Sequence, residues 1–346
     1  MKLSTQLNYA GGFKQGVDQV VELERAGLDM VWVAEAYSFD AVSSMGYLAA
    51  RTTTVEIAAG ILPIYTRTPT LLAMSAAGVD ALSEGRCILG LGASGPQVIE
   101  GFHGVPYDRP LGRTREIIEI CRQVWRREKV EHVGASYQIP VPEGRGTGLG
   151  KPLKLINHPV RSAIPIYVAS LGPKNVEMTA ELADGWLPLF YVPEKAQHVW
   201  GADLAAGAAQ RSSDLAPLEV VAGGLLSIGD GAEAMRELAR PTTALYVGGM
   251  GAKGRNFYND LVKRYGYEAE AEAIQDLYLD GKKDEAAALV PEELLQATSL
   301  CGSEGYVRER LAAYKESGVT VLNVTPIGPD PVKLIEQLKG WIEDLA

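Results

Sequence analysis

The sequence predicts an α/β fold, a (β/α)8 TIM barrel that forms a single domain over residues 1–346. A unit made of an amphipathic stretch, a turn ending in glycine and an apolar burst recurs four times, at Gly27, Gly85, Gly185 and Gly318. The glycine suits the left-handed position after a helix, and the burst suits a buried strand. The run at 87–91 does not alternate with polar residues, which is typical of a parallel strand covered on both faces. Eight strands in chain order favour a closed barrel over an open sheet.

The first half of the chain supplies four of these strands. They are expected at 2–7, 30–34, 55–61 and 87–91. The apolar positions Val17, Val20 and Leu23 predict the inner face of a helix after the first strand, and Pro69 suits the first turn of a helix that continues to Gly85. A long loop is expected at 95–112 and a helix at about 114–127.

The second half supplies the other four strands and two insertions. Strands are expected at 165–169, at 186–189, within 218–228 and at 320–324, with closing helices at 304–317 and 331–345. The segment 130–155, after the fourth strand, is rich in glycine and proline and predicts an inserted hairpin or lid. Residues 232–302, after the seventh strand, form a segment that is too long for a single crossover helix. This helical insertion could cover a substrate mouth, form a subunit interface or add a helical layer.

Composition and charge limit the partners and the location. The formal net charge of −10 disfavours nucleic acid or an anionic membrane surface as the main partner. No segment reaches the 18 apolar residues of a membrane span, and the first residues lack the apolar core of a signal peptide. We therefore expect a cytoplasmic protein. The three cysteines and four histidines show no metal-binding spacing, so we expect buried free thiols and no metal.

The loops after the strands are the expected site, because barrel enzymes place their chemistry at the carboxyl ends of the strands. Two segments there, GASG at 92–95 and SLGPK at 170–174, predict backbone anion pockets, and the second opens a helix. Gly90, Gly92 and Gly95 are expected to take positive φ, so that N–H groups converge on a phosphate. Their spacing also fits G-x-G-x-x-G, so a dinucleotide site or a turn without ligand stays an alternative.

The same loops hold few of the usual catalytic groups. They contain no strand-end histidine, no Ser-His-Asp set and no pair of nearby carboxylates. Pro96 also stands where a nucleophile elbow around Ser94 would need glycine. A site of this kind indicates that a bound cofactor supplies the chemistry.

Four stretches carry a resemblance to a known family. They are GLDMVWVAEAYSFDAVSSMGYLAARTTTVEIAAGILPIYTRTP, GRCILGLGASGPQV, IPIYVASLGPKNVEMTAELADGWLP and SGVTVLNVTP, and together they span nearly the whole barrel. With them the chain resembles the luciferase-like oxidoreductases, in the branch of methylenetetrahydromethanopterin reductases and dehydrogenases that use the deazaflavin coenzyme F420. The tract GGMGAKGRNFYNDLVKRYGY resembles a subgroup of that branch.

The resemblance implies a set of site residues. Members carry a non-proline cis peptide in a bulge of the third strand, which here would be the bond from Gly60 to Ile61, behind the deazaflavin ring. Glu35 and Tyr37, after the second strand, are the candidate catalytic residues. The residues implied to bind the cofactor are Glu35, Ala59, Gly60, Ile61, Gly92, Ala93, Ser94, Gly95, Ala169, Ser170, Leu171, Gly172, Lys174 and Trp186.

One departure from the family bears on the reaction. Relatives that oxidise sugar phosphates end the second strand in an Asp-His pair, whereas this chain has Glu35-Ala36. The resemblance therefore implies hydride transfer between the deazaflavin C5 and a small organic substrate, as a reductase rather than an alcohol dehydrogenase. The alternatives are a monooxygenase that uses reduced FMN and a non-catalytic binding protein. A homodimer is expected from the relatives, and the substrate is not determined by the sequence.

Overall fold

The predicted closed barrel is confirmed. The computed structural model describes residues 1–8 and 12–345. Its eight barrel strands pair in parallel and in chain order, and the last pairs back with the first, so the sheet is closed. They are β1 (Lys2–Gln6), β2 (Met30–Val33), β3 (Glu56–Ala59), β5 (Cys87–Gly92), β8 (Ile166–Ala169), β9 (Gly185–Leu187), β10 (Glu219–Ile228) and β12 (Val321–Pro326).

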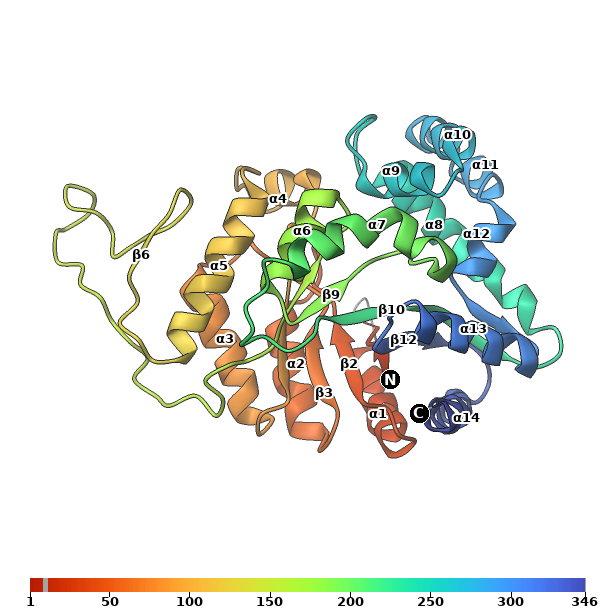
Figure 1. Ribbon diagram of the computed structural model, residues 1–346, viewed down its shortest axis with the longest axis horizontal. Helices are drawn as coiled ribbons and strands as arrows, with labels where there is room; N and C mark the ends of the chain where they lie inside the picture. Colours follow the sequence, from red (N-terminus) through yellow and green to blue (C-terminus); the bar gives the residue numbers. More distant parts are fainter. Residues whose placement is uncertain (9–11, 346) are drawn as a thin grey trace.

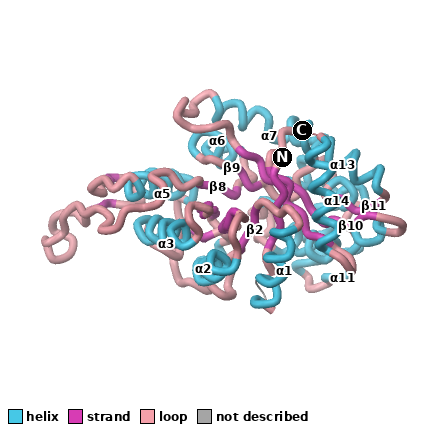
Figure 2. Tube along the Cα trace, turned by 90° about the horizontal axis from the view of Figure 1, so that it is seen from below, coloured by secondary structure: helices cyan, strands magenta, loops and turns pink. Residues whose placement is uncertain are grey.

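Helices surround these strands (Figures 1 and 2). They are α1 (Phe13–Arg25), α2 (Ala41–Arg51), α3 (Pro69–Leu82), α5 (Pro110–Trp125), α6 (Pro173–Leu182), α7 (Pro193–Ala208), α13 (Glu304–Glu316) and α14 (Pro331–Asp344). Local sequence fixes several starts. Asp40 caps α2 by accepting the Ser43 N–H at 2.9 Å, and Thr68 caps α3 ahead of Pro69. The sequence analysis assigned no helix at α2.

The barrel interior and the layer outside it are separate apolar cores. The inner core consists of Met30, Trp32, Ala58, Ile88, Tyr167, Val221 and Val321. The outer core packs the other face of the strands against the helices. Both faces of each strand are thus covered, which is why the strands are apolar without alternation. The three cysteines are free and buried, as predicted.

The third strand is interrupted by a bulge that enters the barrel. β3 ends at Ala59, and the chain resumes pairing with β5 at β4 (Leu62–Pro63). The bond from Gly60 to Ile61 is cis. A Cβ on Gly90 would lie 1.7 Å from the Ala59 carbonyl oxygen, and one on Gly92 would lie 2.7 Å from Ile61 Cγ1. Neither glycine, nor Gly95, has positive φ, so that prediction is wrong: Gly90 and Gly92 are required by the close approach of the bulge.

Two further expectations are corrected. Gly27, Gly85 and Gly318 take the left-handed conformation after a helix, but Gly185 lies within β9 and does not. A Cβ on Gly185 would lie 2.4 Å from the Tyr167 ring, so this glycine is required by packing. The loop expected at 95–112 contains the short helix α4 (Pro96–Gly101), because Pro96 suits a first helical turn, and α5 already begins at Pro110.

The segment 130–155 forms most of an arm that extends away from the barrel (Figure 1). β6 (His132–Val133) and β7 (Gln138–Ile139) pair antiparallel within it. The hairpin is held on α5 by Glu116, whose carboxylate accepts the N–H groups of Ser136 at 3.0 Å and Tyr137 at 2.8 Å. Backbone hydrogen bonding to a carboxylate thus fixes the base of the arm.

The segment 232–302 is mainly helical. It contains η1 (Ala232–Ala239), α8 (Arg240–Ala244), η2 (Leu245–Gly249), α9 (Phe257–Arg264), α10 (Glu268–Leu279), α11 (Lys283–Ala288) and α12 (Glu292–Ala297). It ends in β11 (Leu300–Gly302), which pairs in parallel with β10 outside the closed barrel. This added strand, absent from the sequence analysis, joins the insertion to the sheet.

We expect Gly90→Ala to destabilise the protein by about 1–3 kcal/mol or more, because the new methyl group would collide with the Ala59 carbonyl. The matched control is Gly340→Ala in α14, where a Cβ meets nothing within 4 Å and alanine should stabilise the helix by about 0.5–1 kcal/mol. Urea unfolding measures both. Equal stability of the Gly90 variant and wild type would contradict the close approach.

Candidate active site at the carboxyl end of the barrel

The carboxyl ends of the parallel strands form one rim of the barrel. Most of the predicted site segments follow these ends: Glu35 follows β2, the bulge follows β3, residues 93–95 follow β5, and 170–174 follow β8. A closed parallel barrel brings these loops to the same end, although up to 139 residues separate them along the chain. We call this end the rim.

The loop 93–95 is exposed and braced from one side. Ser94 takes the left-handed conformation with φ 58°. Its carbonyl oxygen accepts a hydrogen bond from the Tyr107 hydroxyl at 3.4 Å. Gly95 then begins α4 without a side-chain cap. The bend expected of the glycines therefore occurs at Ser94, and backbone N–H groups around it are open to an anion.

The loop 170–174 is held from behind by two indoles. Trp186 Nε1 donates to the Ser170 carbonyl at 2.9 Å, and Trp200 Nε1 donates to the Leu171 carbonyl at 3.0 Å. The Ser170 hydroxyl pairs with Thr179 at 2.9 Å. Gly172 begins α6 without a side-chain cap, and a Cβ there would meet nothing within 4 Å. Open space therefore lies in front of the first turn of a ten-residue helix.

Two predicted cofactor residues lie differently from the rest. Trp186 is fully buried in the outer core, where its ring packs near-perpendicular to those of Tyr191 and Trp200, and it hydrogen-bonds the loop at the carbonyl of Ser170. Lys174 has 81% of its side chain exposed and pairs with Glu177 at 2.9 Å. Trp186 therefore supports the loop from behind, whereas Lys174 is a solvated cation on the surface.

Glu35 is held by a partner that the sequence analysis missed. Arg67, in the loop between β4 and α3, donates to both carboxylate oxygens of Glu35, at 2.5 and 2.8 Å. The same carboxylate accepts the N–H of Ala41 at 2.8 Å, at the start of α2. Both side chains are largely buried, and the hydrogen bonds that Arg67 donates to the Glu35 carboxylate raise the pKa of Arg67. Glu35 thus joins the loops after β2 and β4.

Tyr37 lies on the surface of the same loop, with 67% of the residue exposed. Its ring packs beside Phe102 at 6.1 Å, at the end of α4. The floor below the bulge is Trp32, which packs against Tyr167 at 5.8 Å and whose buried Nε1 has no hydrogen-bond partner among the described residues. A Cβ on Gly60 would lie 3.3 Å from Trp32 Cε3, so the indole lies directly beneath the bulge.

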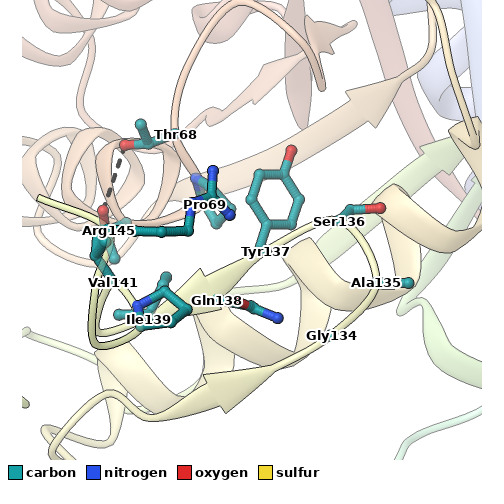
Figure 3. A pocket seen from close by; sticks show the side chains of 12 residues that line it. Thr68, Pro69, Gly134, Ala135, Ser136, Tyr137, Gln138, Ile139, Val141 and Arg145 are labelled. Carbon is teal, nitrogen blue, oxygen red and sulfur yellow. Dashed lines mark hydrogen bonds between the residues drawn. The ribbon is translucent and has the colours of Figure 1, made fainter.

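The arm and the start of α3 line an open pocket of about 470 Å³ that is separate from these residues (Figure 3). It lies between the hairpin and the start of α3, and the side chains of Tyr137 and Arg145 point into it. None of the predicted site residues lines it. We therefore do not assign it to the rim.

Over residues 1–8 and 12–345, no cluster of histidine, cysteine or carboxylate side chains could hold a metal ion. Within the same range no helix is long and apolar enough to cross a membrane.

A family model described as luciferase-like monooxygenase matches residues 1–321. The chain belongs to this family. A protein of Mycobacterium tuberculosis, provisionally named a coenzyme F420-dependent oxidoreductase, is 41% identical over 339 residues, which cover 96% of this chain and 97% of that protein. This luciferase-like chain is also 29% identical over 321 residues to the 5,10-methylenetetrahydromethanopterin reductase of Archaeoglobus fulgidus, covering 90% of each.

A solved structure shares the fold of this family member. It is the coenzyme F420-dependent tetrahydromethanopterin reductase of Methanopyrus kandleri, with a TM-score of 0.80 and 23% identity. The match covers 97% of this chain and 96% of that one. The luciferase-like barrel described above is therefore shared over nearly its whole length.

Glu35→Gln should lower the free energy of unfolding by about 1.5–3 kcal/mol, because glutamine keeps the shape but removes a charge-assisted pair with Arg67. Lys174→Gln, which breaks an exposed pair, is the control and should change stability by less than about 1 kcal/mol. Denaturant unfolding at neutral pH compares them. A Glu35 variant as stable as the control would show that this pair does not anchor the rim.

Proposed function

We propose that the protein is a coenzyme F420-dependent oxidoreductase that transfers hydride between the deazaflavin C5 and a small organic substrate. The 41% identical relative carries this name, and the solved reductase of Methanopyrus kandleri is also named coenzyme F420-dependent. The observation that carries the proposal is the composition of the rim. Open backbone N–H groups and a bulge lie there, while the carboxylate of Glu35 is committed to Arg67.

The residues present fit this cofactor. The start of α6 at Gly172 offers uncapped N–H groups and open space for a phosphate, and loop 93–95 offers further N–H groups. The bulge at 59–61 would form the wall behind the ring, above Trp32. Trp186 would hold the Ser170 loop in place from behind. When bound, the coenzyme supplies the hydride chemistry that these side chains lack.

We propose that the protein acts as a reductase rather than as an alcohol dehydrogenase. Ala36 stands where alcohol-oxidising members are expected to carry a histidine base, and alanine cannot accept a proton. Glu35 does not replace that base readily, because both of its oxygens accept hydrogen bonds from Arg67. The catalytic roles of Glu35 and Tyr37, and a cytoplasmic location, stay predictions.

We also propose a homodimer. Helix α3 presents Leu71, Met74 and Leu82 on one exposed face, although α3 is otherwise packed in the core. The arm adds further exposed apolar residues, including Leu149 and Ile156. Exposed apolar residues gathered in this way are typical of a protein interface, and the homodimer expected from the sequence makes a second copy the proposed occupant.

Titration of the purified protein with oxidised F420, followed by fluorescence, should show binding that FMN does not match. Gly172→Val should weaken F420 binding at least about tenfold, because the side chain would fill the open space before α6. Gly340→Val, also in open space but on α14, is the control. Preference for FMN would favour the monooxygenase alternative, and wild-type affinity of the Gly172 variant would contradict this cofactor position.

Sedimentation velocity should show a dimer that Met74→Lys converts to monomer, because a charge would be buried in the interface. Leu279→Lys on α10 is the control, since both residues are 53% exposed. A wild-type monomer, or an unchanged dimer in the Met74 variant, would contradict this interface.

A further inference from the structure

An aromatic cluster joins the helical insertion to the loop after β9. It consists of Phe190, Tyr246 and Tyr258, a group that the sequence analysis did not single out. The Tyr246 and Tyr258 ring centroids lie 4.8 Å apart, and Phe190 lies 5.7 and 6.3 Å from them. All three pairs are near perpendicular, so each ring edge meets a neighbouring face. These contacts fix the three rings relative to one another.

The backbone of the insertion positions the two tyrosines. Asn256 is buried, and its side-chain amide donates to the carbonyls of Tyr246 at 2.9 Å and Val247 at 3.0 Å. Its oxygen accepts the Tyr258 N–H at 3.0 Å, at the start of α9. One side chain therefore locks both tyrosine backbones. Tyr246 also lies in η2, a π-helical turn, a conformation that is frequent at functional sites.

The cluster and Tyr107 belong to the same end of the barrel. Burial, together with the neighbouring phenols of Tyr246 and Tyr107, raises the pKa of Tyr258, so the Tyr258 hydroxyl stays protonated. Tyr107 donates to the Ser94 carbonyl and packs against Tyr65 at 5.0 Å. Phe190 follows β9, and Tyr107 follows β5, so both belong to the rim. In Figure 1, α4 and α9 lie at this same end of the barrel.

Three cations near the ends of the strands are already engaged, two by carboxylates and one by a backbone carbonyl. Arg67 is bound to Glu35, and Arg113 is bound to Asp108 at 2.7 Å while its guanidinium lies over Tyr65. Lys195, in the first turn of α7, donates to the Tyr265 carbonyl. An anionic ligand would have to break one of these pairs to gain a counter-charge. The aromatic face is thus suited to neutral ligands.

We propose that Phe190, Tyr246 and Tyr258, with Tyr107, form the substrate face of the site and select uncharged planar carbonyl or conjugated compounds over phosphorylated or carboxylated ones. This inference rests on the proposed function for the reaction itself. Ring faces and edges supply the binding energy for a planar molecule, and a neutral phenol can donate a hydrogen bond to its carbonyl oxygen. The insertion is therefore assigned to substrate selection.

Three probes of similar size test this selection by saturation-transfer NMR and calorimetry. Acetophenone is neutral and planar, benzoate is planar but charged, and cyclohexyl methyl ketone is neutral with a saturated ring. We expect acetophenone to bind about tenfold or more tightly than either of the others. Equal or tighter binding of benzoate or of the saturated ketone would overturn the proposal. Each titration uses the protein with and without F420.

Variants locate the binding face. Tyr258→Leu should weaken acetophenone binding about five- to tenfold, and Tyr258→Phe, which keeps the ring, should weaken it less. Tyr47→Leu is the control, because it removes a ring from the Phe13–Tyr47 pair between α1 and α2, which is not part of the aromatic cluster. Unchanged binding in Tyr258→Leu would overturn the assignment. Failure of F420 to bind would contradict the proposed function but not the proposed substrate face. The titrations without F420 still test that face.

Discussion

The packing of the β3 bulge against the bare backbone of β5 is the constraint on which the rim depends. A closed barrel of eight strands normally fills its interior with side chains. Here the Ala59 carbonyl and the Ile61 side chain enter that interior, and they fit only because Gly90 and Gly92 have no side chains. The bulge then rests on Trp32. The bulge therefore fills the space that side chains at Gly90 and Gly92 would occupy, and it forms the wall of the proposed cofactor site.

Support from the outer core fixes the second half of the site. Trp186 and Trp200 use their indole N–H groups to bind backbone carbonyls of the loop after β8. Buried indoles need such partners, and each carbonyl that is held from behind orients its peptide. The N–H groups at the start of α6 are thereby left for a ligand. Large aromatic residues outside the barrel would thus support the proposed cofactor loop without reaching the rim.

The long insertion acts on the rim through contacts that cross much of the chain. Its length and its tyrosines are visible in the sequence, but three roles were compatible with them. Among the contacts that tie the segment to the barrel are the pairing of β11 with β10 and the Tyr265 hydroxyl, which donates to the Phe190 carbonyl at 2.7 Å. The aromatic cluster is a product of this docking, since Phe190 and Tyr258 belong to different barrel units.

The sequence by itself determined the barrel, because apolar strands, helix caps and the left-handed glycines Gly27 and Gly85 are local features with strong steric causes. It also located the loops that follow the strands. Tertiary structure alone decided why Gly90 and Gly185 are glycines, and it paired Glu35 with Arg67, 32 residues away. Such requirements arise from neighbours brought together by strand closure. Local sequence determines the conformation of a segment. A site also depends on which segments the tertiary structure brings into contact.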